Sequence, residues 1–494
     1  MVFSSVLFIW VFLPISIILY CIAATAPVKK ESTSIRIKNR VLLLVSLCFY
    51  ALGGWKYLML LGGVLVINYL GGILVNSDEK ILAKASLILT IIADLGALFC
   101  FKYLNLFVVI FENVSANQPA AQSFENIVKL TRTGFLDYTE IILPIGISFY
   151  IFQSISYVAD IYKREATVQK NFFDFALYVS FFPQLIAGPI VKYSDVDKQI
   201  RSRKETFPLC AEGVGRFIYG LAKKVLIANT MAEIADEIWS MKLTGLGAGV
   251  TWLAAVCYTL QIYFDFSGYS DMAIGLGKIF GFNFKENFNY PYVSTSVKEF
   301  WRRWHISLST WFKEYVYIPL GGSRKGLARN LINLFIVFLL TGIWHGANFT
   351  FIVWGLIYAL FLIIERLFLG KILEKKQLKV VGWIYTMLIV IISWVFFRAD
   401  NIYQAGEFIT QMFSKGRGEY TIFSFLSMRG LIALVAGVIL CTPIYKIVEK
   451  KIKDNEKVAK TFSLIETVWQ IVLMLYSMVV IISGTYNPFI YFQF

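Results

Sequence analysis

The sequence has few charged residues and only two histidines. Charged side chains make up 16% of the 494 residues, against roughly a quarter in soluble globular proteins. Hydrophobic residues make up 57% and aromatic residues 17%, and apolar runs of about 20 residues, enough for a helix to cross a bilayer, recur along the chain. The composition excludes a soluble enzyme and predicts an all-α polytopic membrane protein with a single membrane domain, residues 1–494.

Paired cysteines are also lacking. Six cysteines are scattered along the chain, and their spacing indicates neither a disulfide framework nor a metal site. The net charge of +15 is a candidate signal for nucleic acid, but the basic residues lie in short loops between apolar runs. The positive-inside rule accounts for that pattern, so we expect no metal and no nucleic-acid partner.

Loop charge predicts the topology. The strongly basic loop 29–40 is expected in the cytoplasm, which leaves the N-terminus outside. The first apolar run, 3–24, has no basic residue before it, the reverse of a secretory signal peptide, and should be retained. Later basic stretches are also predicted to be cytoplasmic: 163–170, 198–204, 324–329, 371–376 and 449–460.

The remaining loops complete this map. The polar loop 113–140 and the C-terminal NPFIYFQF are expected outside. Counting apolar segments gives roughly ten to twelve crossings, some of them interrupted. In FFPQLIAGPIV (181–191), two prolines and a glycine at membrane depth predict either a kinked span or a re-entrant segment buried in protein.

His345 lies inside an apolar excursion that starts and ends with basic residues, Arg329 and Lys371. About 15 helical residues rise about 20 to 25 Å, which takes His345 past the centre of a hydrocarbon core about 30 Å thick. An ionisable side chain at that depth is expensive and marks a functional site. The structural alternative is a neutral imidazole hydrogen-bonded between packed helices.

His305 lies in a segment that predicts an amphipathic helix over 296–317. Ser296 and Glu299 form a capping-box pattern at its start, and Pro319 with Gly321 and Gly322 ends it. Aromatic residues on one side and charged residues on the other are typical of the membrane interface. The local pattern favours a snorkelling interfacial histidine, with Arg302, Arg303 and Trp304 beside it.

A third unusual segment, YFDFSGYSDMAIG (263–275), carries two carboxylates inside apolar sequence. The pattern predicts that Asp265 and Asp271 flank a turn at FSGYS. Unpaired carboxylates there are costly, so we expect them to pair with Arg302 or Arg303, hold a histidine tautomer or stabilise the turn. The hydroxyl-bearing residues of this turn are Ser267, Tyr269 and Ser270.

Several segments together resemble the membrane-bound O-acyltransferase family, in the branch of the bacterial alginate O-acetylation proteins and the related D-alanyl-transfer protein of teichoic acid synthesis. The resemblance covers most of the chain: a core over 141–400, N-terminal helices over 1–112 and C-terminal helices over 401–494. Its motifs are PIGISFYIFQSISYVADIY, FFPQLIAGPIV, YFDFSGYSDMAIG, EFWRRWHISLSTWF, GIWHGANFTFIVWG, WVFFRAD and PFIYFQF.

The resemblance implies a ring of roughly ten to twelve transmembrane helices, with re-entrant and interfacial helices, around a central funnel and tunnel. It matches His345 and His305 to the family's two histidines. It also implies a bacterial inner-membrane enzyme that moves an acyl group, by preference acetyl, from a cytoplasmic thioester to a hydroxyl of an extracytoplasmic polysaccharide. The donor would be acetyl-CoA or an acyl carrier, with no tightly bound cofactor.

The chemistry of such a transfer assigns roles to these residues. A neutral imidazole at His345 can take the hydroxyl proton as general base, and Asn348 is a candidate donor to the oxyanion. Arg302, Arg303 and Trp304 are candidate donor contacts, as are Asp265, Ser267, Tyr269 and Asp271, and the arginines can attract a phosphate.

Several alternatives stay open at this point. A transporter or channel with His345 as proton relay is the competing class, and a scaffold of a synthase complex is a third. Transfer can be direct or pass through a secreted or membrane-anchored acetyltransferase partner. Acetyl and D-alanyl groups, and alginate, peptidoglycan, cellulose or another exopolysaccharide as acceptor, are not separated by any motif.

Overall fold

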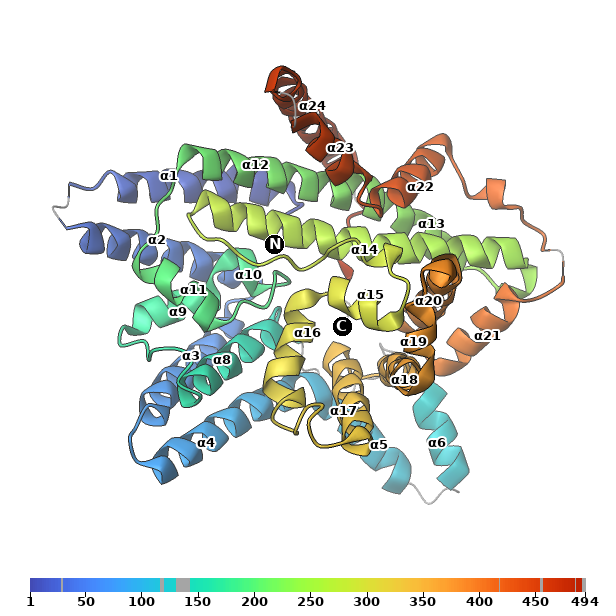
Figure 1. Cartoon of the computed structure of the whole chain (residues 1–494), viewed down its shortest axis with the longest axis horizontal. Helices are drawn as coiled ribbons and strands as arrows, with labels where there is room; N and C mark the ends of the chain where they lie inside the picture. The colour runs from blue at the N-terminus through green and yellow to red at the C-terminus, as the bar shows by residue number, and fades with distance from the viewer. Residues whose placement is uncertain are drawn as a thin grey trace.

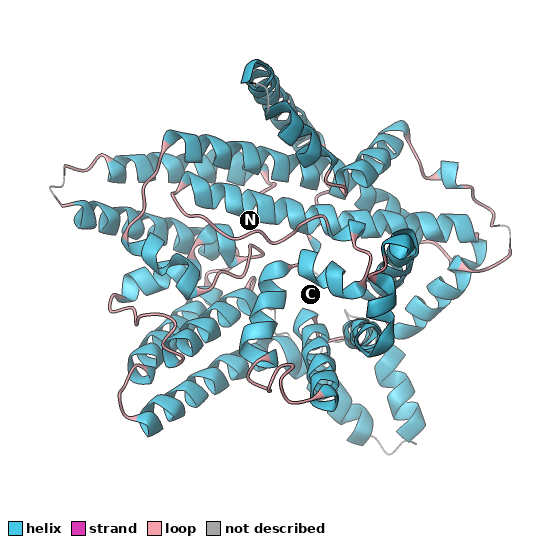
Figure 2. Ribbon diagram, in the orientation of Figure 1, coloured by secondary structure: helices cyan, strands magenta, loops and turns pink. Residues whose placement is uncertain are grey.

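The described part of the chain is helical. The computed structural model describes residues 1–27, 30–115, 120–129, 143–416, 418–453, 456–484 and 486–490, and within these ranges it has no β-strand (Figure 2). The predicted all-α fold is confirmed. The N-terminal helices are α1 (Leu13–Ala24), α2 (Glu31–Ala51), α3 (Lys56–Val75), α4 (Lys80–Leu98), α5 (Leu104–Ser115) and α6 (Ala120–Lys129).

The other helices follow in two groups. The middle helices are α8 (Ile147–Tyr162), α9 (Phe172–Ser180), α10 (Phe182–Leu185), α11 (Tyr193–Arg201), α12 (Phe207–Ala222), α13 (Asn229–Trp239), α14 (Ala248–Ile279), α15 (Val297–Arg303) and α16 (Ile306–Phe312). The C-terminal helices are α17 (Leu327–His345), α18 (Phe349–Ile364), α19 (Gly370–Leu373), α20 (Lys379–Arg398), α21 (Ile402–Met412), α22 (Met428–Leu440), α23 (Ile444–Lys453) and α24 (Glu456–Ser483).

Shorter helical segments extend or link these helices. Five are π-helical: η1 (Phe8–Phe12), η2 (Phe99–Tyr103), η3 (Lys223–Ala228), η6 (Lys313–Tyr317) and η7 (Glu365–Leu369). Four are 3₁₀ turns: η4 (Leu243–Gly245), η5 (Pro291–Val293), η8 (Lys376–Leu378) and η9 (Ile422–Ser424).

Six helices of the described chain are long and apolar enough to cross a membrane, or seven if one bent pair counts as a span. The predicted ten to twelve crossings also count shorter apolar helices, such as Phe8–Ala24, so that number stays a prediction. The six are Lys56–Val75, Lys80–Ser115, Leu327–His345, Phe349–Leu373, Lys376–Arg398 and Val458–Ser483.

Figure 1 shows how these helices are arranged. The short helices α15 and α16 lie near the middle of the view, with α17, α18 and α20 close to them. The long α14 runs across above this group beside α12, and α3, α4 and α8 lie to its lower left. The central helices thus bring together the three segments that carry the sequence motifs.

Glycines allow α12 and α14 to pack closely. A Cβ atom added at Gly220 would lie 2.5 Å from the carbonyl oxygen of Gly268, and one added at Gly275 would lie 2.5 Å from that of Gly213. The two pairs are seven residues apart on each helix and run in opposite directions, so the helices are antiparallel. Small residues at such an interface let two backbones approach, as is common between membrane helices.

The segment 181–191 breaks as predicted. It forms the four-residue α10 and then an irregular stretch, and all of its residues are buried. Irregular backbone at membrane depth is tolerated where protein covers it. Phe182 donates its backbone N–H to Ser46 Oγ at 3.1 Å, so a side chain of α2 satisfies part of the broken backbone.

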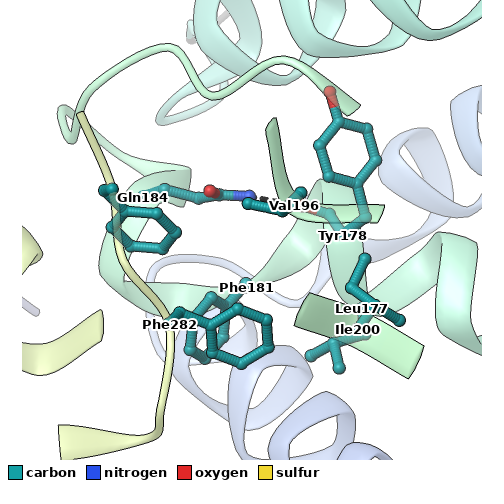
Figure 3. A pocket seen from close by; sticks show the side chains of 8 residues that line it. Leu177, Tyr178, Phe181, Gln184, Val196, Ile200 and Phe282 are labelled. Atoms are coloured by element: carbon teal, nitrogen blue, oxygen red, sulfur yellow. Dashed lines mark hydrogen bonds between the residues drawn. The ribbon is translucent and has the colours of Figure 1, made fainter. Parts of the chain in front are cut away.

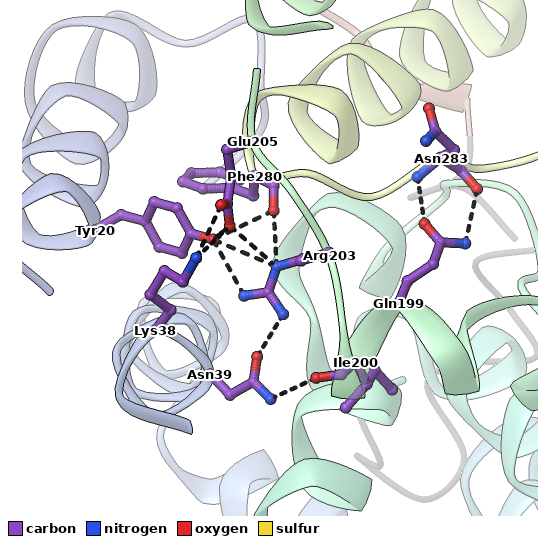
Figure 4. Close-up of polar contacts among 9 residues, drawn as sticks. All are labelled: Tyr20, Lys38, Asn39, Gln199, Ile200, Arg203, Glu205, Phe280 and Asn283. Atoms are coloured by element: carbon purple, nitrogen blue, oxygen red, sulfur yellow. Dashed lines mark hydrogen bonds and ion pairs between the residues drawn. The ribbon is translucent and has the colours of Figure 1, made fainter. Parts of the chain in front are cut away.

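Two basic stretches that are far apart in sequence meet at one place (Figure 4). Lys38, which lies on α2 within the stretch 29–40 that was expected to be a loop, forms an ion pair with Glu205 at 2.8 Å. Arg203, from the stretch 198–204, donates to Asn39 Oδ1 at 2.6 Å and to the carbonyl of Phe280 at 3.1 Å. The structure thus brings these two stretches into contact, and their cytoplasmic location stays a prediction.

The two ends of the chain also meet. Ser4 and Asn487 exchange side-chain hydrogen bonds, and Asn487 Nδ2 donates to the carbonyl of Ser4 at 3.1 Å. Asn229 donates to the same asparagine at 3.2 Å. The two ends therefore lie together, and their location outside stays a prediction. The greater part of the predicted outer loop 113–140 and residues 491–494 lie outside the described residues.

Candidate active site

His345 is the last residue of α17, at the point where the chain turns back into α18. The two helices pack tightly because Gly342 and Gly355 lie against the backbone of the facing helix. The chain thus enters and returns around His345, as the flanking basic residues predicted. Since α17 has 19 residues, its length of about 28 Å carries His345 through most of a hydrocarbon core.

Aromatic rings surround the His345 imidazole. The ring centroids of Trp344 and Trp354 lie 4.9 Å away and that of Phe397 lies 5.1 Å away, all edge-to-face. The residue is 6% exposed. Its Nδ1 atom is buried and has no hydrogen-bond partner among the described residues. A ring nitrogen held in an apolar setting without a partner is free to accept or release a proton when a substrate arrives.

His305 does not snorkel at an interface. The predicted continuous helix 296–317 is broken between α15 and α16, where His305 has a left-handed backbone (φ 43°, ψ 55°). The residue is 1% exposed, and its ring packs edge-to-face on Phe266 at 4.6 Å. The amphipathic pattern correctly predicted buried Trp301, Trp304 and Trp311 but gave no signal for the break.

The hydrogen bonds of Asn287 define the His305 tautomer. Asn287 Oδ1 accepts from the Ser307 backbone N–H at 3.1 Å and from Ser307 Oγ at 2.9 Å, so this atom is the amide oxygen. His305 Nδ1 lies 3.2 Å from the same oxygen and is therefore the protonated nitrogen. Nε2 then carries a lone pair, and it is buried with no partner in the described structure.

Trp344 lies between the two histidines. Its ring centroid is 4.9 Å from that of His345 and 6.1 Å from that of His305. Burial lowers the pKa of His305, which lies outside the apolar spans, to about 3, so this imidazole is neutral at neutral pH. The two histidines are 40 positions apart in the sequence and lie near the same tryptophan. They stood out in the sequence because the chain has only two histidines.

Asn348 caps a helix. Its Oδ1 accepts from the backbone N–H of Thr350 at 2.9 Å, the N-cap bond of α18, and its Nδ2 donates to the carbonyl of Asp400 at 3.0 Å. The Nδ2 group carries a second hydrogen that neither bond uses. The role of Asn348 as an oxyanion donor therefore stays a prediction.

The two carboxylates of α14 do not flank a turn, because residues 263–275 are continuous helix. Asp265 forms a buried ion pair with Lys224 at 2.8 Å and accepts from the backbone N–H of Ile490 at 2.9 Å. Asp271 pairs with Arg216 at 2.8 Å and with Lys223 at 2.6 Å. The predicted pairing with Arg302 or Arg303 is wrong: the basic partners come from α12 and η3.

The hydroxyl-bearing residues of this segment are buried in the same helix. Tyr269 stacks on Phe3 with centroids 4.5 Å apart and lies 4.8 Å from Phe489. The hydroxyl groups of Ser267, Ser270 and Tyr269 have no hydrogen-bond partner among the described residues. The surroundings of Tyr269 are the two chain ends, so it packs between them rather than beside a histidine.

The two arginines of α15, Arg302 and Arg303, lie in different environments. Arg302 is exposed. Arg303 forms an ion pair with Glu299 at 2.9 Å and donates to the carbonyl of Asn289 at 3.1 Å. Ser296 Oγ caps the helix as predicted, by accepting from Glu299 N–H at 3.1 Å, but the Glu299 carboxylate bonds Thr295 instead of closing the capping box.

Lys102 was missed by the sequence reading. It lies in η2, inside the long apolar span Lys80–Ser115, and its ammonium group donates to the carbonyl of Trp344 at 2.5 Å and to Ser148 Oγ at 3.2 Å. The signal was available, because a lone charge within FCFKYLNLF is itself a mark of a functional position in a membrane.

Two other features of the described residues do not involve the histidine pair. A small pocket between α9, α10 and α11 is lined mainly by apolar side chains and includes neither histidine (Figure 3). Within the described residues, no group of three or more metal-ligating side chains is placed to hold a metal ion. The convergence of ionisable groups therefore places the candidate site at Trp344.

Comparison with known proteins defines the class. The model of the membrane-bound O-acyltransferase family matches residues 163–404. The chain is 38% identical to a probable alginate O-acetylase, AlgI, of Pseudomonas putida over the full length of both. It is 42% identical to the probable alginate O-acetylase AlgI of Pseudomonas aeruginosa over 87% of this chain and 78% of that protein.

A further relative is the peptidoglycan O-acetyltransferase of Helicobacter pylori, at 36% identity over 82% of this chain and 78% of that protein. The chain therefore belongs to the membrane-bound O-acyltransferase family. Within it, the chain is a multi-pass membrane O-acyltransferase of the alginate O-acetylation branch.

Proposed function

We propose that this enzyme transfers an acetyl group from a cytoplasmic thioester, acetyl-CoA or an acyl carrier, to a hydroxyl of an extracytoplasmic polysaccharide in the bacterial inner membrane. The names of its relatives support acetyl as the group and a polysaccharide as the acceptor. The observation that carries the proposal is the convergence of two buried histidines on Trp344, with a ring nitrogen of each left without a partner in the described structure.

In this proposal His345 is the general base. As the acceptor oxygen forms its bond to the acyl carbon, the imidazole takes the hydroxyl proton. The carbon–sulfur bond then breaks, and the imidazolium returns the proton to the leaving thiolate. The imidazole ends neutral, so one cycle converts a thioester and an alcohol into an ester and a thiol. The surrounding aromatic rings exclude water, which would otherwise hydrolyse the thioester.

His305 and Arg302 belong to the donor side. The Nε2 lone pair of His305 is fixed by the Asn287 contact at Nδ1, so Nε2 can accept a hydrogen bond from the donor. Arg302 is exposed, whereas Arg303 is held by Glu299. Arg302 is thus the better placed of the two for a phosphate of coenzyme A or phosphopantetheine. The ion pairs of Asp265 and Asp271 support structural roles for both carboxylates.

The transfer can end in two ways. The enzyme can acylate the polysaccharide directly, or it can pass the acetyl group to a hydroxyl of an extracytoplasmic partner that completes the transfer. Both versions need the same base and the same donor side. They differ when the partner is absent: direct transfer still places the ester on the polysaccharide, whereas transfer through the partner does not.

The test uses membrane vesicles that contain the full chain, with radiolabelled acetyl-CoA supplied on the donor side. Alginate and peptidoglycan fragments are supplied on the other side. We expect chain-dependent label that mild base releases from polysaccharide, or from a partner protein when one is added. No chain-dependent ester label from acetyl-CoA or from an acetylated carrier would contradict the proposal.

A further inference from the structure

The C-terminal turn of α17, which presents His345, is held by two neighbouring side chains of another span. Lys102 Nζ donates to the carbonyl of Trp344 at 2.5 Å, and Tyr103 Oη donates to the carbonyl of Ile343 at 2.9 Å. The last four carbonyls of a helix have no partner within the helix. Lys102 and Tyr103 thus satisfy two consecutive carbonyls directly before His345.

The backbone around Lys102 is a π-helical turn, one of five such segments in the described chain. It covers Phe99–Tyr103 and lies between α4 and α5. Turns of this kind inside α-helices are frequent at functional sites. Here the turn directs two consecutive side chains toward α17, and the span beyond it packs on the residues after His345, since Leu106 and Val109 contact Ala347 and Phe349.

A neutral donor would satisfy a helix end at lower cost than a lysine. The ammonium group of Lys102 is bonded to a carbonyl and to the Ser148 hydroxyl rather than to a carboxylate, and it lies 5.6 Å from the Trp344 ring centroid. A charge within a membrane span is expensive. When it is protonated, a lysine makes a shorter hydrogen bond, roughly twice as strong as that of a neutral donor.

We propose that Lys102 is a positioning residue for acyl transfer: with Tyr103, it holds the end of α17 so that the His345 imidazole keeps its place against the acceptor hydroxyl. This rests on the proposed function of His345. Lys102 does not touch the reacting atoms. It acts through the Trp344 carbonyl, one peptide unit from the base, and it ties the span Lys80–Ser115 to the site.

The first arm of the test is kinetic. Lys102→Met is compared with wild type, with Lys102→Arg and with Lys80→Met, which removes an exposed lysine at the start of the same span. Because a misplacement of about 1 Å can cost about 100-fold in rate, we expect Lys102→Met to lower kcat by about 10- to 100-fold. The KM for acetyl-CoA should stay within about twofold, Lys102→Arg should recover part of kcat, and Lys80→Met should match wild type.

The second arm does not depend on acetyl transfer. The chain has only two histidines, so their modification by diethyl pyrocarbonate can be followed separately by mass spectrometry in the purified full chain. We expect Lys102→Met to change the rate at His345 while His305 reacts as in wild type. Tyr103→Phe, which loses one neutral hydrogen bond, should show a smaller change at His345 alone.

The outcomes separate the two proposals. Near-normal kcat and unchanged histidine reactivity in Lys102→Met would overturn the positioning role, and so would equal changes at both histidines, which indicate general loss of structure. If Lys102→Met does not fold, Lys102→Gln takes its place under the same criteria. If wild type transfers no acetyl, the proposed function fails, and His345 reactivity alone decides the role of Lys102.

Discussion

The two histidines differ in what holds their ring nitrogens. His305 donates from Nδ1 to an amide oxygen that two Ser307 groups also bind, so its tautomer is fixed. His345 has aromatic rings around it and an Nδ1 without a described partner. Each histidine nevertheless keeps one ring nitrogen without a described partner, so the proposal of His345 as the base rests on its place at the end of the apolar span Leu327–His345.

Burial of His305 predicts a dependence of stability on pH. Its pKa in the folded protein, about 3, lies below the ordinary value of about 6.5. Between these values the unfolded chain binds a proton that the folded chain does not. The contribution of neutral His305 to the free energy of unfolding is therefore complete above pH 6.5 and is lost as the pH falls toward 3. Thermal unfolding in detergent at pH 7.5 and pH 5 should show a larger drop in Tm for wild type than for His305→Gln. Equal drops would show that His305 is not held neutral.

At the scale of helices, the site depends on close packing that glycine permits. Gly220→Ala would drive a Cβ atom into the Gly268 carbonyl of α14. Overpacking of this kind typically costs about 1 to 3 kcal/mol, so we expect a lower Tm and less folded protein. Gly406→Ala is the matched control, because a Cβ atom there meets nothing within 4 Å and should stabilise α21 by about 0.5 to 1 kcal/mol. Similar Tm values for both variants would contradict the close α12–α14 contact.

Helices and motifs were easier to predict than breaks and partners. The broken segment 181–191 and the α17–α18 excursion followed from prolines, glycines and flanking charge, which act locally. The break at His305 did not, because it depends on Asn287, 18 residues away, and on burial of the ring. The partners of Asp265 and Asp271 lie on α12 and η3, and one sequence cannot show which helices pack together.

At the scale of the whole molecule, contacts between distant parts of the chain bring the basic stretches 29–40 and 198–204 together and bring the two chain ends together. Lys38 and Arg203 meet at Glu205, and Ser4 meets Asn487. The positive-inside rule predicts that the first group lies in the cytoplasm and the chain ends outside. The funnel and tunnel that the family resemblance implies stay predictions.

Cysteine labelling tests this orientation. In a background without the exposed Cys21, Cys48 and Cys100, single cysteines replace Lys375 and Tyr486. A membrane-impermeant maleimide added to intact cells should label the position of Tyr486 and miss that of Lys375, which should react only after permeabilisation. Labelling with the sides exchanged would invert the whole map and put the proposed donor side outside.

The central claim is that His345 performs the proton transfer, and the most direct measurement is acetyl transfer by His345→Gln at matched amounts of folded protein. Glutamine keeps a hydrogen-bonding amide but cannot act as a base, so we expect kcat to fall by about 10²- to 10⁴-fold. His305→Ala, measured beside it, should lose less in kcat and more in donor affinity. Near-normal turnover by His345→Gln would show that His345 is a packed structural histidine and would contradict the mechanism.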